Sequence, residues 1–326
     1  MSIKQFINPL KKQGEILLVE TWKTSLILFK IVIPVSIVTK LLNDWGIIGY
    51  IGIALGPVMK LAGLPGSVGI VWATAMITNL YAAIIVFSTL LPTVHLTVAQ
   101  VTVITTMMLV AHSLPIELRI AQKAGPRLRF MLLLRVSCAL LAGFLLNRLY
   151  IAGGYLQTEF TAVWKPEISD PSWAAWAVAE LKTLLSIYGI ILLLLFIVRV
   201  LTWLHVTDLL GRFLKPVLQM MGMSSDAAPI TIIGMTMGIG YGGGLIIREA
   251  QSGRLSMRDV FFSLSFMGLM HSMIEDTLLM ILLGGHVSGV LFFRFLFAML
   301  VIFLLVRMMK QVSDRTFKRF FFRAAV

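Results

Sequence analysis

The chain has 326 residues, of which 58% are hydrophobic and 13% are charged, and its mean hydropathy is +0.92. A soluble domain carries about a quarter charged residues, so this composition excludes an ordinary soluble protein. The net charge of +13 does not indicate nucleic-acid binding, because most Lys and Arg lie in short segments beside apolar runs, where they set membrane orientation. The single cysteine, Cys138, excludes an internal disulfide and a cysteine metal cluster.

Apolar runs of about 18 residues or more recur along the chain, and each is long enough to cross about 30 Å of hydrocarbon. Runs of this length are helices, because the strands of a membrane barrel need only about ten residues. We therefore predict an all-α integral membrane protein. Residues 1–22 carry acidic groups in an amphipathic pattern without a cleavage site, which indicates a retained interfacial helix rather than a signal peptide.

An internal repeat is the main feature of the chain's organisation. Residue pairs recur in the same order at a shift of 159 or, in the last pair, 160: Lys23-Thr24 and Lys182-Thr183, Pro57 and Pro216, Gly63 and Gly222, His112-Ser113 and His271-Ser272, Arg135 and Arg294, Tyr81 and Tyr241. Several are rare polar residues inside apolar runs. Matches in one order at nearly constant spacing predict two homologous halves.

Each half is predicted to contain five spans, which gives about ten transmembrane helices. The spans fall near 23–42, 47–63, 67–90, 97–120 and 129–151, and near 182–206, 208–222, 226–247, 257–283 and 287–309. The second span of each half is short and amphipathic, so a half-span or an interfacial helix stays open there. We divide the chain into an interfacial helix (1–22), a first repeat (23–151), an extracytoplasmic loop (152–181), a second repeat (182–309) and a basic cytoplasmic tail (310–326).

Loop charge predicts the orientation of these spans. With the N-terminus in the cytoplasm, the basic segments 119–129 and 248–258 and the C-terminal tail fall inside, whereas the acidic loop 152–181 falls outside. An odd number of spans in each half makes the two repeats inverted. Inverted repeats are typical of secondary transporters, whose sites form near the midplane where the repeats meet. We expect a bacterial inner-membrane protein with both termini in the cytoplasm.

The fourth span of each half carries polar and ionisable residues near mid-membrane. These residues are His112, Ser113 and Glu117 in the first half, and His271, Ser272, Glu275 and Asp276 in the second. Ionisable groups at that depth cost several kcal/mol, so they face a cavity or a partner. Pro115 is expected to kink the first of these helices. We predict a polar centre across the pseudo-twofold axis, which suits proton relay, a cation site or a polar solute; the alternative is a structural cluster.

Two further sets of residues are candidates for the same centre. The third spans hold Asn79 and Tyr81 in one half, and the glycine-rich segment with Gly240, Tyr241 and Gly242 in the other. Dense glycines indicate either an unwound segment that lines a site or close helix packing. Arg135 and Arg294 lie early in the fifth spans. They either extend to lipid headgroups or are buried, where they pair with Glu117 or Asp276 or attract an anion.

Several motifs resemble those of the nucleoside-recognition, or Gate-domain, membrane proteins: ALGPVMKLAGLPGSVGI, GIGYGGG, HSLPIE and HSMIED. That group includes the spore maturation A and B proteins and, more remotely, the membrane parts of nucleoside symporters and ferrous-iron permeases. The resemblance covers roughly 45–150 and 205–310 and implies a membrane protein that recognises nucleoside-like solutes. This chain has neither the GTPase domain nor the pore cysteines of the iron permeases, which argues against iron transport.

We therefore expect a secondary transporter of a small polar or anionic solute, nucleoside-like in class, with proton coupling through the His and carboxylate centre. One alternative is a divalent-cation permease with ligands His112, Glu117, His271, Glu275 and Asp276. Others are movement of an anionic lipid, with Arg135 and Arg294 as receivers, and a non-transporting scaffold or partner subunit.

No nucleophile stands beside a base, so we expect neither an enzyme nor a cofactor. The expected partners are membrane lipid, the small solute and protons, and no nucleic acid. A homodimer and a heteromer with a related membrane protein are both open.

Overall fold

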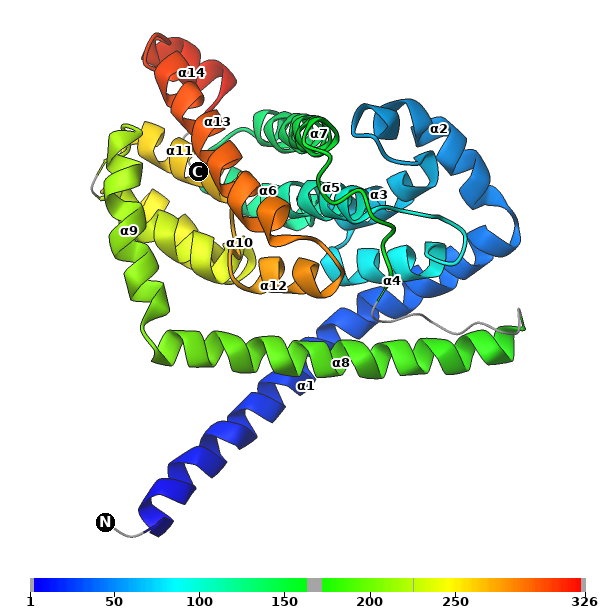
Figure 1. The fold of residues 1–326 in the computed structure, drawn as a ribbon. Helices are drawn as coiled ribbons and strands as arrows, with labels where there is room; N and C mark the ends of the chain where they lie inside the picture. Colours follow the sequence, from blue (N-terminus) through cyan, green and yellow to red (C-terminus); the bar gives the residue numbers. More distant parts are fainter. Residues whose placement is uncertain (1–2, 163–171, 225, 324–326) are drawn as a thin grey trace.

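The structure, a computed structural model, describes residues 3–162, 172–224 and 226–323, without the side chains of residues 3–13, 207–208, 237 and 239–246. Within these ranges every regular element is a helix (Figure 1). The first half contains α1 (Ile3–Asp44), α2 (Ile47–Leu61), the 3-10 turn η1 (Gly66–Val68), α3 (Gly69–Ile77), α4 (Leu80–Leu90), α5 (Val98–Val110), α6 (Leu114–Lys123) and α7 (Leu128–Ala152). The second half contains α8 (Trp173–Trp203), α9 (Val206–Met220), α10 (Ala227–Gln251), α11 (Met257–Leu269), α12 (Glu275–Leu282), the π-helix η2 (Ser288–Phe293), α13 (Arg294–Met309) and α14 (Asp314–Phe320).

Five helical stretches are long and apolar enough to cross a membrane: Gly14–Asp44, Val98–Lys123, Leu128–Ala152, Trp173–Trp203 and Ser288–Met309. Ile47–Leu61 and Gly66–Ile77 form a sixth candidate, a pair bent by 97°. The expected second spans correspond to α2 and α9, which have 15 residues each. At 1.5 Å per residue such a helix reaches about 22 Å, less than the hydrocarbon thickness. The chain is thus an all-helical membrane protein with five or six candidate spans in its described part.

Several expected boundaries differ from the observed helix ends. α1 continues without a break through residues 22 and 23, where a separate interfacial helix was expected to end. α8 begins at Trp173, nine residues before the predicted span at 182, because Ser172 caps it by accepting a hydrogen bond from the Ala175 amide. The tail also contains a short helix, α14, which Ser313 caps through the Thr316 amide.

The 159-residue shift also relates the ends of helices. α2 and α9 correspond at both ends, and so do α5 and α11. The caps correspond as well, since the Thr97 hydroxyl accepts from the Gln100 amide and the Ser256 hydroxyl from the Asp259 amide. Residues with positive φ recur at the same shift: Gly46 and His205, Gly63 and Gly222, Ser113 and Ser272, Gly125 and Gly284. The halves therefore share backbone conformations as well as residues.

Four of the long expected spans are broken near their middle. The third span of the first half ends at Ile77 and restarts as α4, where Asn79 accepts a hydrogen bond from the Ala82 amide at 2.9 Å. Its counterpart, α10, leaves helical geometry at Gly238, which is 159 residues after Asn79. The fourth spans break at residues 111–113, between α5 and α6, and at 270–274, between α11 and α12. Broken helices at membrane depth occur only inside protein or beside a cavity.

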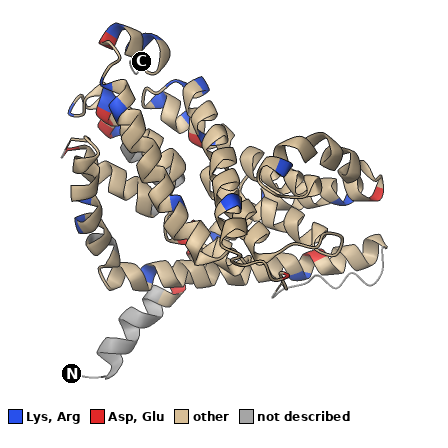
Figure 2. Ribbon diagram, turned by 45° about the horizontal axis from the view of Figure 1, so that its top comes forward, with Lys and Arg blue, Asp and Glu red and all other residues tan. Residues whose placement is uncertain are grey.

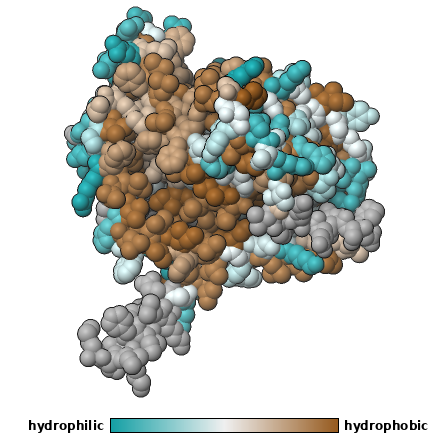
Figure 3. Space-filling model, in the orientation of Figure 1, coloured by the Kyte–Doolittle hydropathy of each residue, from teal (hydrophilic) through white to brown (hydrophobic). Residues whose placement is uncertain are grey.

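The broken helices lie inside, and long apolar helices lie outside. Every residue of α5 from Val101 to Val110 is buried, and so is every residue of α11 from Val260 to Leu269. α1 and α8 contact each other and cross at the edge of the molecule (Figure 1). They expose large apolar side chains such as Ile27 and Leu185, and the face drawn in Figure 3 is apolar over much of its area. This arrangement gives a lipid-facing surface around a protein-lined interior.

The bend after α2 depends on a close backbone contact. A Cβ at Gly66, the first residue of η1, would overlap the carbonyl oxygen of Gly52 on α2. A Cβ at Gly49, which also lies on α2, would have nothing within 4 Å. We predict that Gly66→Ala destabilises the protein by about 1–3 kcal/mol, since backbone must move. The matched control Gly49→Ala is expected to be neutral or slightly stabilising. Thermal unfolding in detergent measures both, and equal unfolding temperatures would contradict this account of the bend.

Candidate functional site

The two breaks in the fourth spans bring His112 and His271 together. Each imidazole is anchored four residues back along its own chain: His112 Nδ1 lies 3.0 Å from Met108 O, and His271 Nδ1 lies 2.8 Å from Met267 O. A carbonyl oxygen only accepts hydrogen bonds, so each Nδ1 carries the hydrogen. In the neutral ring this leaves Nε2 as an acceptor on both histidines.

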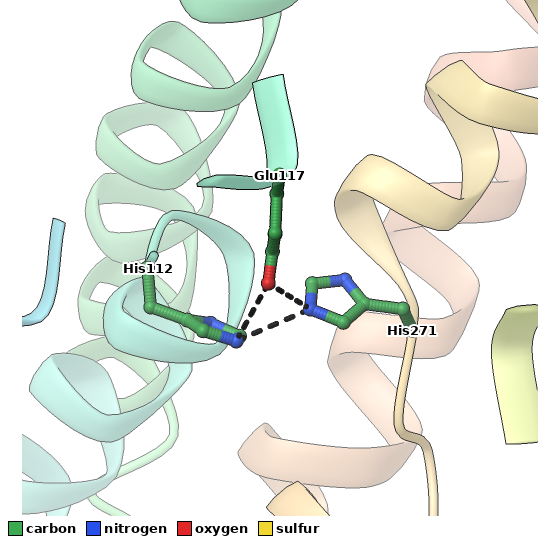
Figure 4. Close-up of side chains that lie close together, drawn as sticks. All are labelled: His112, Glu117 and His271. Atoms are coloured by element: carbon green, nitrogen blue, oxygen red, sulfur yellow. Dashed lines mark hydrogen bonds and ion pairs between the residues drawn. The ribbon is translucent and has the colours of Figure 1, made fainter. Parts of the chain in front are cut away.

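These two acceptors point toward one another. The Nε2 atoms are 3.1 Å apart, and Glu117 Oε1 lies 3.1 Å from His271 Nε2 and 3.6 Å from His112 Nε2 (Figure 4). All three residues are at most 6% exposed. Asp276 Oδ2 adds a fourth oxygen, 3.5 Å from His112 Nε2. Equivalent residues of the halves therefore meet, because Asp276 is also the counterpart of Glu117 at the 159-residue shift.

Two buried arginines surround this cluster. Arg135 donates from Nη1 to Glu117 Oε2, and from Nε to Val110 O at 3.0 Å. Arg294 donates from Nε to Leu269 O at 3.1 Å. Its Nη2 also donates to the carbonyls of His271 and Leu109, at 3.0 and 3.2 Å. The structure thus buries both arginines, and they bond carbonyls that the ends of α5 and α11 leave without helical partners.

The breaks themselves are held by backbone geometry. Ser113 and Ser272 adopt positive φ angles of 48° and 43°. The Ser113 amide donates to Ala75 O at 2.9 Å, which ties the break to α3. In the other half the Met273 amide donates to Met235 O at 2.7 Å on α10. A Cβ at Gly238 would overlap the Ser272 hydroxyl, so α10 approaches this break closely. The dense glycines of this segment predicted an unwound stretch or close packing, and the break falls at Gly238, one of those glycines.

The remaining candidates have other placements. Glu275 is partly buried in the first turn of α12. Asn79 caps α4, and Tyr81 packs against an apolar cluster that includes Ile85 and Ile187. The surroundings of Gly240 and Gly242 and the side chain of Tyr241 lie outside what the structure describes. The structure therefore brings six candidates into one centre: His112, His271, Glu117, Asp276, Arg135 and Arg294.

The formal charges of this centre balance, but its acceptor atoms lie close together. The guanidinium groups and the two carboxylates offset each other in charge, and each carboxylate lies in the first turn of a helix, where the dipole favours an anion. Two imidazole lone pairs and one carboxylate oxygen nevertheless converge within 3.6 Å. Acceptors at such distances repel one another unless a proton or a metal ion lies between them.

Comparison with known proteins agrees with the family resemblance. The chain is 28% identical over 285 residues to the uncharacterized membrane protein YvoD of Bacillus subtilis (strain 168), which covers 86% of this chain and 89% of that protein. No solved structure matches the chain. The sequence model of the Gate family, described as nucleoside recognition, matches residues 25–127. These residues include His112 and Glu117 of the centre. The family resemblance is therefore supported over residues 25–127, which match the Gate model.

Proposed function

We propose that the chain is a secondary membrane transporter whose centre consists of His112, His271, Glu117 and Asp276 with their two arginines. The carrying observation is that equivalent histidines of the two halves meet at 3.1 Å inside broken helices. Intramembrane ionisable groups and broken helices at the junction of two repeats are typical of transport sites. The proposed solute is small and polar or anionic, and nucleoside-like in class, which the Gate match supports.

The proposed architecture is ten helices in two inverted repeats. Contact between equivalent residues supports a pseudo-twofold axis through the centre. Contacts between loops also support this topology. At the end expected to be outside, Leu96 O accepts a hydrogen bond from the Phe160 amide at 2.8 Å, and His95 pairs with Glu159. At the end expected to be cytoplasmic, Arg127 bonds Lys318 O at 3.1 Å.

Basic residues at that second end support the orientation. A cleft of about 1010 Å³ there is lined by Lys123, Arg127, Arg129, Arg319 and Arg323. Figure 2 shows Lys and Arg near the C-terminal helices on a ribbon that is mostly uncharged. The proposal therefore includes cytoplasmic termini in a bacterial inner membrane.

Coupling to a cation is the mechanistic part of the proposal. The converging acceptors need a positive charge between them, and the sequence-based expectation is a proton. Because the histidines and Glu117 are almost fully buried, the centre is closed in this structure. Cation arrival and departure would then accompany alternating exposure to the two sides.

Two of the alternatives are weakened by specific contacts. Arg135 and Arg294 are at most 1% exposed, so in this closed arrangement their guanidinium groups are not accessible to a lipid headgroup. A purely structural cluster would use groups that satisfy one another, whereas this one places two imidazole acceptors face to face. The scaffold alternative is decided by the transport experiment below.

The topology can be tested by thiol labelling. In a Cys138→Ser background, Thr93→Cys and Ser252→Cys place single thiols at exposed positions that differ by 159 residues. We expect a membrane-impermeant maleimide to label Thr93→Cys from outside and Ser252→Cys only from the cytoplasmic side. Labelling of both from one side would refute the inverted arrangement.

The transport proposal is tested by uptake of radiolabelled uridine into proteoliposomes, normalised to folded protein, with and without an imposed pH gradient. We expect the wild type to accumulate uridine in a cation-dependent way. Asp276→Asn removes an anion beside the histidines, so driven accumulation should fall by at least about tenfold, while counterflow exchange persists. His95→Gln is the matched control, because that exposed histidine pairs with Glu159 at the surface, and it should behave as wild type.

The opposite outcomes are equally informative. Absence of uridine uptake by wild type would contradict the nucleoside-like class. Unchanged normalised uptake in Asp276→Asn, together with a lowered unfolding temperature, would assign the centre to helix packing.

A further inference from the structure

We propose that His112 Nε2, His271 Nε2 and Glu117 Oε1 form a binding site for a divalent transition-metal ion of the zinc class. This inference goes beyond the proposed transport function, since it makes no assumption about which solute is moved. It follows from the distances between the donor atoms, from the groups that hold the ligands, and from the difference between the two halves.

The donor atoms have the spacing of metal ligands. Their separations are 3.1, 3.1 and 3.6 Å. Ligand atoms around a tetrahedral ion with bonds of about 2.0–2.1 Å lie about 3.3 Å apart. A single ion placed between the three donor atoms could therefore bind all of them at their present positions. Figure 4 shows the three side chains, which come from different segments, directed at that point. A single proton cannot replace the ion fully, because it bridges two of these atoms and leaves the third unsatisfied.

The groups behind the ligands also match those of metal sites. Metal-binding histidines commonly donate their second ring N–H to a carbonyl, which fixes the tautomer and the ring orientation. His112 and His271 do this with Met108 O and Met267 O. The second oxygen of Glu117 is held by Arg135. Each donor is therefore oriented before an ion arrives.

The difference between the halves leaves one coordination position open. Glu117 reaches both histidines and Arg135, whereas its counterpart Asp276 is one methylene shorter and approaches only His112, at 3.5 Å. A three-coordinate ion with one open position can take Asp276, water or a solute atom as its fourth ligand. Two imidazole nitrogens in the set favour Zn²⁺ and similar ions over Mg²⁺ and Ca²⁺, which prefer oxygen.

Metal binding can be measured directly on the full chain without its purification tag, treated with EDTA and held in detergent. We expect Zn²⁺ to raise the unfolding temperature by several degrees in a saturable way, and about one equivalent to remain after desalting; Mg²⁺ should do neither. His112→Gln and His271→Gln should abolish both effects, because each removes one imidazole ligand. The control His95→Gln removes an exposed histidine and should bind like wild type.

A second measurement covers the case in which the ligand variants do not fold. Co²⁺ added to the wild type should give visible absorption bands and an X-ray absorption spectrum with imidazole and oxygen ligands at one equivalent. Zinc should displace it. Absence of a saturable Zn²⁺ shift and of a one-equivalent Co²⁺ spectrum would overturn the proposal, as would wild-type binding by a folded His112→Gln/His271→Gln double variant. Both readouts are independent of transport, so failure of uridine uptake leaves them interpretable.

Discussion

The centre depends on one constraint, which is that a helix broken inside a membrane must still satisfy its backbone carbonyls. The breaks after α5 and α11 free the carbonyls of residues such as Val110 and Leu269. Arg135 and Arg294 donate to these two oxygens from equivalent positions in the halves. An unsatisfied polar group in this environment costs several kcal/mol, so the arginines stabilise the breaks directly. The breaks in turn place the histidines where they meet.

Sequence reasoning could identify the repeat and the histidine pair, because rare polar residues in apolar runs carry a strong signal. It could not locate the breaks correctly. Pro115 was expected to kink the helix between His112 and Glu117, but it lies in the first turn of α6, where proline is tolerated. The second half breaks at the equivalent place with Met273 and Ile274 there instead of proline. The common feature is the positive φ of Ser113 and Ser272, and serine carries no clear signal for that conformation.

The role of the arginines was also only partly visible in the sequence. Pairing with Glu117 was among the expectations for a buried Arg135, since opposite charges at membrane depth are usually matched. The carbonyl partners of both arginines could not be inferred, because they depend on where α5 and α11 end. The 15-residue helices α2 and α9 raise a similar difficulty: composition shows that they are short, whereas the 97° bend at Gly66 depends on backbone contact with Gly52.

In the proposed transport cycle, near-symmetry with one unequal pair would give the centre two arrangements of its charges. In this structure Glu117 is paired with Arg135, and Arg294 bonds carbonyls. In that proposed cycle one inverted repeat would rock against the other around the centre, and the two halves would exchange their conformations. Applied to this centre, the exchange would pair Asp276 with Arg294 and release Glu117 from Arg135. Because aspartate is one methylene shorter, the exchanged arrangement cannot reproduce the first, and the two would differ in how strongly they hold a cation between the histidines. A difference in cation affinity between two access states is the property that coupled transport requires.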